Sequence, residues 1–235
     1  MGNTWFQFQQ FRVEQDRCAM KISTDSVLLG TLIQEESPSQ ILDIGTGTGV
    51  IALILAQRYP QAQIQAVELD EDAADQAAEN FAQSPFSSRL KLVKGRFQEF
   101  PEEDRFDLLV SNPPYFPNHL KASDPRRNQA LHTDELSFLD LLEKAVKLLT
   151  EEGSLWVILP PAQMKEFEGL AVKKSFSPGK IISVKDSADS RIIREVAQFR
   201  KTSVCKTEEE LVLKDRDGGF SSSYSRLISG FLLGF

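Results

Sequence analysis

The sequence has very little of the chemistry that binds metals or crosslinks a chain. Its 235 residues include 2 cysteines, Cys18 and Cys205, and 2 histidines, His119 and His132. These residues form no cluster with the spacing of metal ligands, and two distant thiols do not make a disulfide framework. We therefore expect no metal site and two reduced cysteines, as is usual inside cells.

Long apolar runs are missing as well. No stretch approaches the about 18 uninterrupted apolar residues that a membrane span needs, and the N-terminus lacks the charged and then apolar segments of a signal peptide. We expect a cytoplasmic protein without membrane contact. A length of 235 residues suits one α/β domain with elaborations better than two domains. The prediction is a single domain over residues 1–235.

Positive charge is scarce, and the net charge of -7 argues against a general nucleic-acid coat, which needs many Lys and Arg on one surface. The average hides an asymmetry. Residues 1–119 hold 9 Lys and Arg against 17 Asp and Glu, whereas residues 120–206 hold 15 against 12. The second stretch predicts a modest basic face able to meet phosphates, although solvated surface side chains are the more common explanation.

From residue 41 onward, short apolar stretches alternate with helical patterns, which is typical of a mostly parallel sheet with helices on both faces. The predicted strands of this unit are Ile41–Ile44, Ile64–Val67, Leu90–Val93, Asp107–Ser111 and Ser154–Leu159. The predicted helices are Val50–Arg58, Asp72–Gln83 and Phe138–Leu149. Two further strands, Ile181–Val184 and Ile192–Phe199, have no room for a crossover helix between them and predict a closing antiparallel hairpin. Residues 1–40 precede the first strand of this unit and form an N-terminal elaboration.

The strongest local motif is the segment Asp43–Gly49, of sequence DIGTGTG, which follows a strand and opens a helix. Its three glycines, Gly45, Gly47 and Gly49, allow a tight turn and let a ligand approach closely. Asp43, at the end of the strand, is placed to accept a hydrogen bond from a ligand's ammonium group. The alternative is an ordinary Gly-rich turn, but this context favours a small-molecule site.

The spacing of the glycines disfavours a dinucleotide. The dinucleotide pattern G-x-G-x-x-G, counted from Gly45, wants glycine where Val50 stands. Glu68 ends the second strand, where a carboxylate can take both hydroxyls of a ribose. This role is common to NAD and S-adenosylmethionine enzymes, so Glu68 does not distinguish them. The alternative reading of Glu68 is an exposed acid at a helix start.

A second motif, the segment Ser111–Tyr115 of sequence SNPPY, follows another strand and therefore meets the glycine loop at the same sheet edge. Pro113 and Pro114 fix the backbone, so the Asn112 side-chain oxygen and the Pro113 carbonyl can accept from one amino group. Tyr115 supplies a flat face for a planar ring. The alternative is a rigid Pro-Pro loop with an incidental tyrosine.

Together the two motifs resemble those of the class I S-adenosylmethionine-dependent methyltransferases that modify amino nitrogens. Residues 11–30, FRVEQDRCAMKISTDSVLLG, resemble the opening of one subgroup, the bacterial enzymes that methylate N6 of the adenine at position 37 of valine tRNA. The similarity runs through nearly the whole chain. It implies a Rossmann-like, seven-stranded sheet that ends in an antiparallel hairpin, S-adenosyl-L-methionine as cofactor and tRNA as partner.

The resemblance also implies the site residues. It places target-base contacts and catalysis on Asn112, Pro113, Pro114 and Tyr115. It places cofactor contacts on Lys21, Thr24, Asp25, Asp43, Gly45, Gly47, Gly49, Glu68, Phe97 and Asn112. One position departs from the pattern, because Arg96 stands where many relatives carry an acid that reads the adenine amino group. We therefore leave Arg96 out of the predicted site. His132 is expected to be a loop or substrate contact rather than a general base.

Other functions fit parts of these motifs. A glutamine N5-methyltransferase that acts on a protein release factor uses the same Asn-Pro-Pro-Tyr loop on a planar amide. Another RNA methyltransferase that modifies amino nitrogens is a further alternative. The lack of a long helical N-terminal domain favours tRNA over the release factor. A nicotinamide-dependent oxidoreductase is disfavoured by Val50, and a non-catalytic RNA-binding module by the intact Asn112 and Tyr115.

Overall fold

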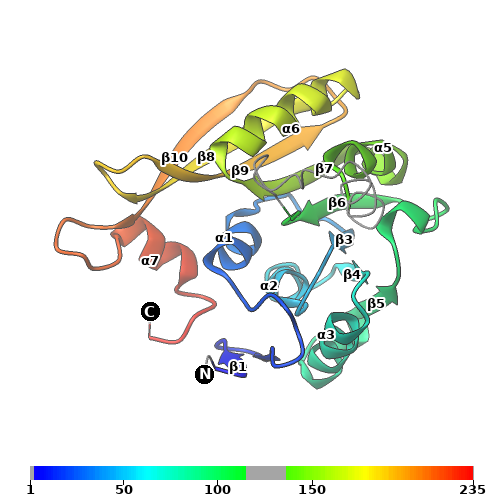
Figure 1. Cartoon of the computed structure of the whole chain (residues 1–235), viewed down its shortest axis with the longest axis horizontal. Helices are drawn as coiled ribbons and strands as arrows, with labels where there is room; N and C mark the ends of the chain where they lie inside the picture. The colour runs from blue at the N-terminus through cyan, green and yellow to red at the C-terminus, as the bar shows by residue number, and fades with distance from the viewer. Residues whose placement is uncertain (1–2, 115–135, 235) are drawn as a thin grey trace, which may run out of the picture.

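The computed structural model describes residues 3–114 and 136–234. These residues form an eight-stranded sheet in the order β10-β8-β9-β7-β6-β3-β4-β5 (Figure 1). Strands β3 to β7 run parallel, β9 is antiparallel to both β7 and β8, and β10 is parallel to β8. The strands are β3 (Gln40–Ile44), β4 (Gln63–Glu68), β5 (Leu90–Lys94), β6 (Phe106–Ser111), β7 (Leu149–Leu159), β8 (Ser177–Ser187), β9 (Ile192–Arg200) and β10 (Thr207–Lys214).

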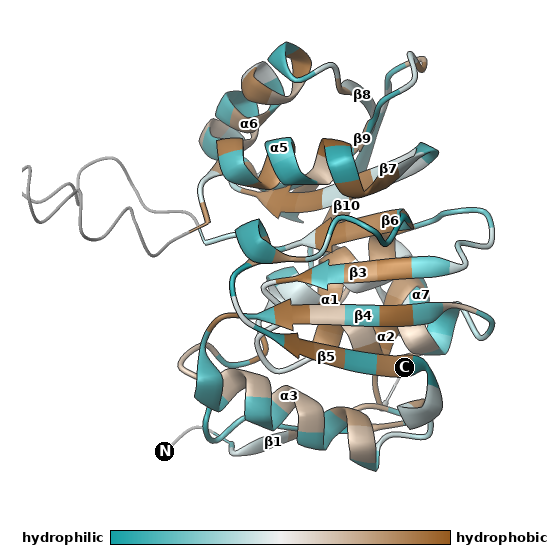
Figure 2. Ribbon diagram, turned by 90° about the vertical axis from the view of Figure 1, so that its right-hand side faces the viewer, coloured by the Kyte–Doolittle hydropathy of each residue, from teal (hydrophilic) through white to brown (hydrophobic). Residues whose placement is uncertain are grey.

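Helices cover both faces of the sheet, which is why its central strands are apolar on both sides (Figure 2). One apolar core gathers side chains of α1 (Thr24–Leu32), α2 (Val50–Arg58) and α3 (Glu71–Gln83). The opposite core gathers those of α5 (Phe138–Leu148) and α6 (Pro161–Lys173). Within the described ranges, no helix is long and apolar enough to span a membrane.

The N-terminal and C-terminal segments contact each other beside the first core, where Phe8 pairs with Leu232 and the backbone amide of Gln9 donates to the carbonyl of Phe231 at 2.8 Å. The strands β1 (Trp5–Gln7) and β2 (Arg12–Glu14) form a separate antiparallel pair, and α7 (Ser222–Ile228) is the last helix. The side-chain amide of Gln9 donates to the carbonyl oxygens of Ser229, at 2.6 Å, and Leu232, at 2.7 Å. The N-terminal segment is therefore anchored on the residues that follow α7. Two short 3-10 turns, η1 (Ser87–Arg89) and η2 (Phe97–Glu99), complete the described elements.

The structure confirms the predicted fold class, the parallel unit and the closing β8–β9 hairpin. The predicted number of seven strands is wrong, because β10 adds an eighth strand at the edge. Its first half is acidic, TEEE, and hides the strand pattern in the sequence. Charges are normal on an edge strand, and here Lys180 pairs with Glu209 and Lys185 with Glu210 across to β8.

Helix α6 was also missing from the predicted elements. Pro160 follows the last residue of β7, and Pro161 occupies the first position of α6, where the backbone N–H of a helix has no partner within the helix and its absence costs nothing.

A carboxylate whose side chain is 11% exposed fixes the amino edge of the sheet. One oxygen of Glu35, in the loop after α1, accepts from Ser154 Oγ, Trp156 Nε1 and Gln198 Nε2, each at 2.6 Å. Its second oxygen pairs with Arg200, also at 2.6 Å. Because Ser154 and Trp156 are fully buried, their donors depend on this carboxylate.

We predict that Glu35→Ala lowers the free energy of unfolding by about 3 kcal/mol, because it leaves buried hydrogen-bond donors and Arg200 without their acceptor. The neighbouring Glu36 is exposed, so Glu36→Ala is a matched control with an expected change below about 0.5 kcal/mol. Urea unfolding of the two variants measures both values. Equal stabilities would contradict the role of Glu35.

Candidate active site

The glycine loop crosses the end of β4 and begins α2. The amides of Gly45 and Thr46 both donate to the carbonyl of Val67, at 2.9 and 3.2 Å. Gly49 has φ 83, and a Cβ there would lie 2.5 Å from the ring of Phe81 on α3. Only glycine fits this position. Gly45 is also left-handed, at φ 70, but has open space beside it. The loop therefore packs closely against α3 on one side and leaves room on the other.

Asp43 lies beneath this loop and is fully buried. Its Oδ2 accepts from Thr46 Oγ1 at 2.5 Å and from Ala52 N at 3.1 Å, so the carboxylate holds the loop to the start of α2. Its Oδ1 has no hydrogen-bond partner among the described residues. Burial raises the pKa of Asp43 to about 7, although the bonds from Thr46 and Ala52 oppose the shift.

Glu68 stands at the end of β4 with its carboxylate held on both sides. Its Oε2 accepts from Gly47 N at 2.8 Å and its Oε1 accepts from Asp70 N at 2.9 Å. Each carboxylate oxygen has more than one acceptor site, so the group keeps capacity to accept further hydrogen bonds. The backbone thus orients the Glu68 carboxylate before any ligand arrives.

A cavity of about 230 Å³ opens at the carboxyl ends of β3, β4, β5 and β6. Its lining is mostly apolar with a few polar groups, as in small-molecule sites. The lining residues are Met20, Ile44, Gly45, Val67, Glu68, Leu69, Gly95, Arg96, Phe97, Gln98, Ser111, Asn112, Pro114 and Leu136.

The sheet register brings the second motif to the same cavity. Ser111, the last residue of β6, pairs with Ile44 of β3, and its Oγ donates to the Ile44 carbonyl at 3.0 Å. Asn112 and Gly45 are the next residues of these neighbouring strands, and both line the cavity. Pro113 is buried and Pro114 is exposed. Tyr115, like His119 and His132, lies outside the described residues.

The structure therefore brings part of the predicted site together. The cavity wall includes five predicted residues, listed here as Gly45, Glu68, Phe97, Asn112 and Pro114. Asp43, Gly47, Gly49 and Pro113 are not on the wall, although the first three build the loop behind it.

Three residues implied by the resemblance also lie off the cavity wall. Lys21 donates from Nζ to the carbonyl of Asn3 at 3.1 Å. Thr24 is exposed at the start of α1. Asp25 pairs with Arg194 of β9, with 2.7 Å between Oδ2 and Nε.

The sequence interpretation missed several wall residues. Arg96, which the predicted site leaves out, lines the cavity beside Phe97. Met20 and Leu69 also line it while being 73% and 47% exposed. Leu69 directly follows Glu68, so its place was foreseeable from the strand end. Nothing in the sequence around Met20 shows where its segment returns to the sheet edge.

Several side chains of the expected basic face bind acids within the chain. Arg200 pairs with Glu35 at 2.6 Å, and Lys174 pairs with Glu143 at 2.7 Å. Among the residues that the structure describes, no three or more His, Cys, Asp or Glu side chains are grouped to hold a metal ion.

We predict that Asp43→Asn changes the pH dependence of stability. The raised pKa means that the folded protein gains stability when Asp43 is protonated and loses it as pH rises from the ordinary value of 3.8 toward about 7. The variant lacks this loss. Its stability relative to the wild type should therefore increase by about 2 kcal/mol between pH 5.5 and pH 8. Urea unfolding at both pH values measures the difference, with Asp72→Asn on the exposed start of α3 as control. Parallel pH curves for Asp43→Asn and the wild type would contradict the prediction.

Comparison with known proteins places these features in a family. The model of the methyltransferase small domain matches residues 18–185. A relative from Parabacteroides distasonis is 41% identical over 236 residues, which cover 99% of both chains. One from Flavobacterium johnsoniae is 43% identical over 97% of this chain and 99% of its own. Both relatives are named tRNA1(Val) (adenine(37)-N6)-methyltransferase.

Solved structures share the fold. A predicted O-methyltransferase from Agrobacterium tumefaciens has a TM-score of 0.71 at 19% identity, covering 88% of this chain and 96% of its own. A glycopeptide N-methyltransferase complexed with S-adenosyl-L-methionine has a TM-score of 0.55 at 12% identity, covering 76% and 93%. Such low identities speak for the fold alone. The sequence matches go further, and by them the chain belongs to the methyltransferase small domain family and, within it, to the family of proteins named tRNA1(Val) (adenine(37)-N6)-methyltransferase.

Proposed function

We propose that this protein transfers a methyl group from S-adenosyl-L-methionine to N6 of adenine 37 in a valine tRNA. The observation that carries the proposal is the placement of Asn112 beside the glycine loop and Glu68, on one cavity, in a chain about 40% identical over its full length to relatives with that name. The fold supplies the cavity, and the Asn-Pro-Pro segment supplies acceptors for an amino group.

The residues at the cavity fit this cofactor. Glu68 presents a preoriented carboxylate suited to the two hydroxyls of a ribose, and Phe97 and Leu69 offer apolar surface to a purine ring. Asp43 Oδ1 is a buried acceptor without a partner among the described residues, which suits a ligand that carries positive charge. Lys21, Thr24 and Asp25 stay predicted cofactor contacts on the resemblance alone.

When bound, S-adenosyl-L-methionine supplies a methyl group that its sulfonium centre makes electrophilic. The protein's part is to prepare the nucleophile. The N6 amino group of adenine is a poor nucleophile because its lone pair is delocalised into the ring. Hydrogen bonds from N6 to the Asn112 side-chain oxygen and the Pro113 carbonyl favour a pyramidal nitrogen and aim its lone pair. No strong base is needed, since the N6 proton becomes acidic only as the new bond forms.

The target base must leave the stack of the anticodon loop to reach this edge of the sheet. Tyr115, which follows the described part of the motif, is proposed to stack on the extruded base. The two acceptors recognise an amino group on a planar system, and the identity of the nucleotide rests on the relatives.

The first experiment is methyl transfer from labelled S-adenosyl-L-methionine to unmodified valine tRNA, followed by nucleoside mass spectrometry. We expect N6-methyladenosine at position 37 and none in the same transcript with guanine at that position. Label in a release-factor glutamine instead would contradict this proposal and support the glutamine N5-methyltransferase, which also acts on a planar nitrogen. No label in either substrate would contradict both.

The same assay tests the role of Asn112. We expect Asn112→Ala to lower kcat by about 100-fold or more, because one of the two acceptors for N6 is lost. The Kd for S-adenosyl-L-methionine, measured by calorimetry, should change less than about threefold, because the cofactor keeps its other contacts. Asn3→Ala, an exposed asparagine near the N-terminus, is the control. An active Asn112→Ala enzyme would contradict the mechanism.

Glu68 gives a separate test of the cofactor site. Glu68→Gln removes one acceptor from a carboxylate that also holds Gly47 and Asp70, so the Kd for S-adenosyl-L-methionine should rise by about tenfold or more. Glu71→Gln removes the same charge from an exposed neighbour and should leave the Kd within about twofold. Equal effects of the two substitutions would show a general charge effect and contradict a specific contact.

A further inference from the structure

The N-terminal segment completes one side of the cavity although it lies outside the large sheet. Met20 is on the cavity wall but 73% exposed, so little packing of its own side chain holds it there. The segment is bent into an arch by Gln15, whose Oε1 accepts from Ile22 N at 2.9 Å. Gln15 is buried, and its Nε2 donates to the carbonyl of Asn3 at 3.0 Å. We call residues 15–22 the cavity arch.

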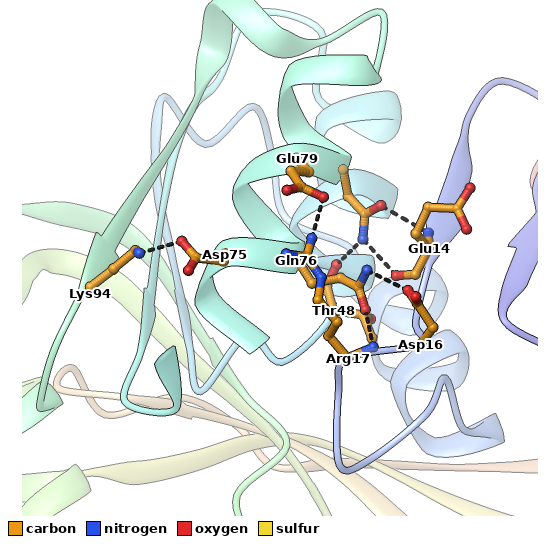
Figure 3. Close-up of polar contacts among 9 residues, drawn as sticks. Glu14, Asp16, Arg17, Thr48, Asp75, Gln76, Glu79 and Lys94 are labelled. Carbon is orange, nitrogen blue, oxygen red and sulfur yellow. Dashed lines mark hydrogen bonds and ion pairs between the residues drawn. The ribbon is translucent and has the colours of Figure 1, made fainter. Parts of the chain in front are cut away.

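Helix α3 holds the start of this arch with a buried amide. Gln76 is 1% exposed, its Oε1 accepts from Arg17 N at 2.8 Å, and its Nε2 donates to Asp16 Oδ1 at 2.9 Å (Figure 3). The bond from Gln76 is the main reason that the pKa of Asp16 lies below its ordinary value. One side chain thus fixes two consecutive residues of the arch.

A second buried amide, Asn80, stands one turn later on α3 and is also 1% exposed. Its Oδ1 accepts from Glu14 N at 2.8 Å, and its Nδ2 donates to the carbonyls of Glu14 and Thr48, each at 2.9 Å. Thr48 belongs to the glycine loop. Asn80 of α3 therefore joins β2, the strand before the arch, to the glycine loop through one amide group.

The position of both amides is unusual for a helix that otherwise buries alanines and one phenylalanine against the core. Burying an amide side chain costs free energy unless its polar atoms are hydrogen-bonded. The bonds that Gln76 and Asn80 make offset this cost and, in addition, fix the neighbouring segments. A further link between α3 and the arch is the ion pair of Arg17 with Glu79, which is largely exposed and of small expected strength.

We propose that Gln76 and Asn80 are positioning residues for cofactor binding: they hold the cavity arch and the glycine loop in place, so that Met20 completes the cavity wall. This inference rests on the proposed function. Gln76 and Asn80 are expected to affect the affinity for S-adenosyl-L-methionine and not the transfer step. Neither side chain lines the cavity that holds Asn112.

The Gln76–Asp16 bond allows a test by exchange of donor and acceptor. Gln76→Glu sets two carboxylates against each other, whereas Asp16→Asn alone keeps an amide oxygen that still accepts from Gln76 Nε2. In the double variant, Asp16→Asn with Gln76→Glu, the new amide donates to the new carboxylate, whose other oxygen still accepts from Arg17 N. We expect Gln76→Glu to raise the Kd for S-adenosyl-L-methionine by about fivefold, Asp16→Asn alone to leave it within about twofold, and the double variant to return it to within about twofold of the wild type.

Two controls separate positioning from charge and from global stability. Glu79→Gln removes one negative charge from the exposed side of the same helix, as Asp16→Asn does from the arch, and should leave the Kd within about twofold. Glu35→Ala weakens the opposite edge of the sheet, so it should lower Tm without changing the Kd. Calorimetry measures the Kd, and kcat at saturating cofactor and the KM for tRNA should change less than about twofold in every arch variant.

An unchanged Kd in Gln76→Glu would overturn the inference, as would a double variant whose Kd stays at the raised value of Gln76→Glu. A Kd change that Glu35→Ala reproduces would assign the effect to stability and overturn it as well. Absence of any binding by the wild type would instead overturn the proposed function, which the wild-type titration reports separately.

Discussion

The parallel pairing of β3 with β6 is the constraint on which the site depends. It sets Ile44 opposite Ser111, and the chain leaves both strands at the same edge. Two segments more than sixty positions apart in the sequence therefore become neighbours there: the glycine loop after β3 and the Asn-Pro-Pro segment after β6. The β3–β4 pairing adds Glu68 in the same way. Because parallel strands all end in one direction, a small set of registers assembles the whole cavity.

The loop itself shows how function and stability oppose each other. Asp43 is fully buried, and one of its oxygens has no partner within the described part of the chain. Burying a carboxylate in this way costs free energy, as the raised pKa of Asp43 expresses. The other oxygen recovers part of that cost by fixing Thr46 and the start of α2. An uncharged residue would avoid this cost, but it would place no carboxyl group beneath the site.

The parts of the fold that were predictable are those whose signals are local. The strands β3 and β6 are short and mostly apolar, α2 follows directly from the glycine turn, and the prolines after Asn112 mark a rigid loop at a strand end. The parts that were missed depend on distant partners. The acidic start of β10 becomes a strand only because lysines of β8 lie opposite, and Pro161 begins α6 only because the helix packs on the second core. Met20 belongs to the same class, since the arch that carries it is bonded to the distant helix α3.

The way in which α3 holds the arch explains why the sequence carries so little sign of it. Of the five bonds that Gln76 and Asn80 make, four go to backbone atoms, of Glu14, Arg17 and Thr48, and one goes to the Asp16 side chain. Bonds to backbone atoms do not depend on which side chains the arch carries. Residues 15–22 therefore need no sequence motif for these bonds to form. Directional amide bonds also suit this place better than apolar packing. The alanines of α3 bring its backbone close but bury little area, whereas each amide specifies both a distance and a direction. The arch places Met20 on the cavity wall while most of its residues stay exposed to solvent. It is therefore held by directional hydrogen bonds more than by the burial of apolar area.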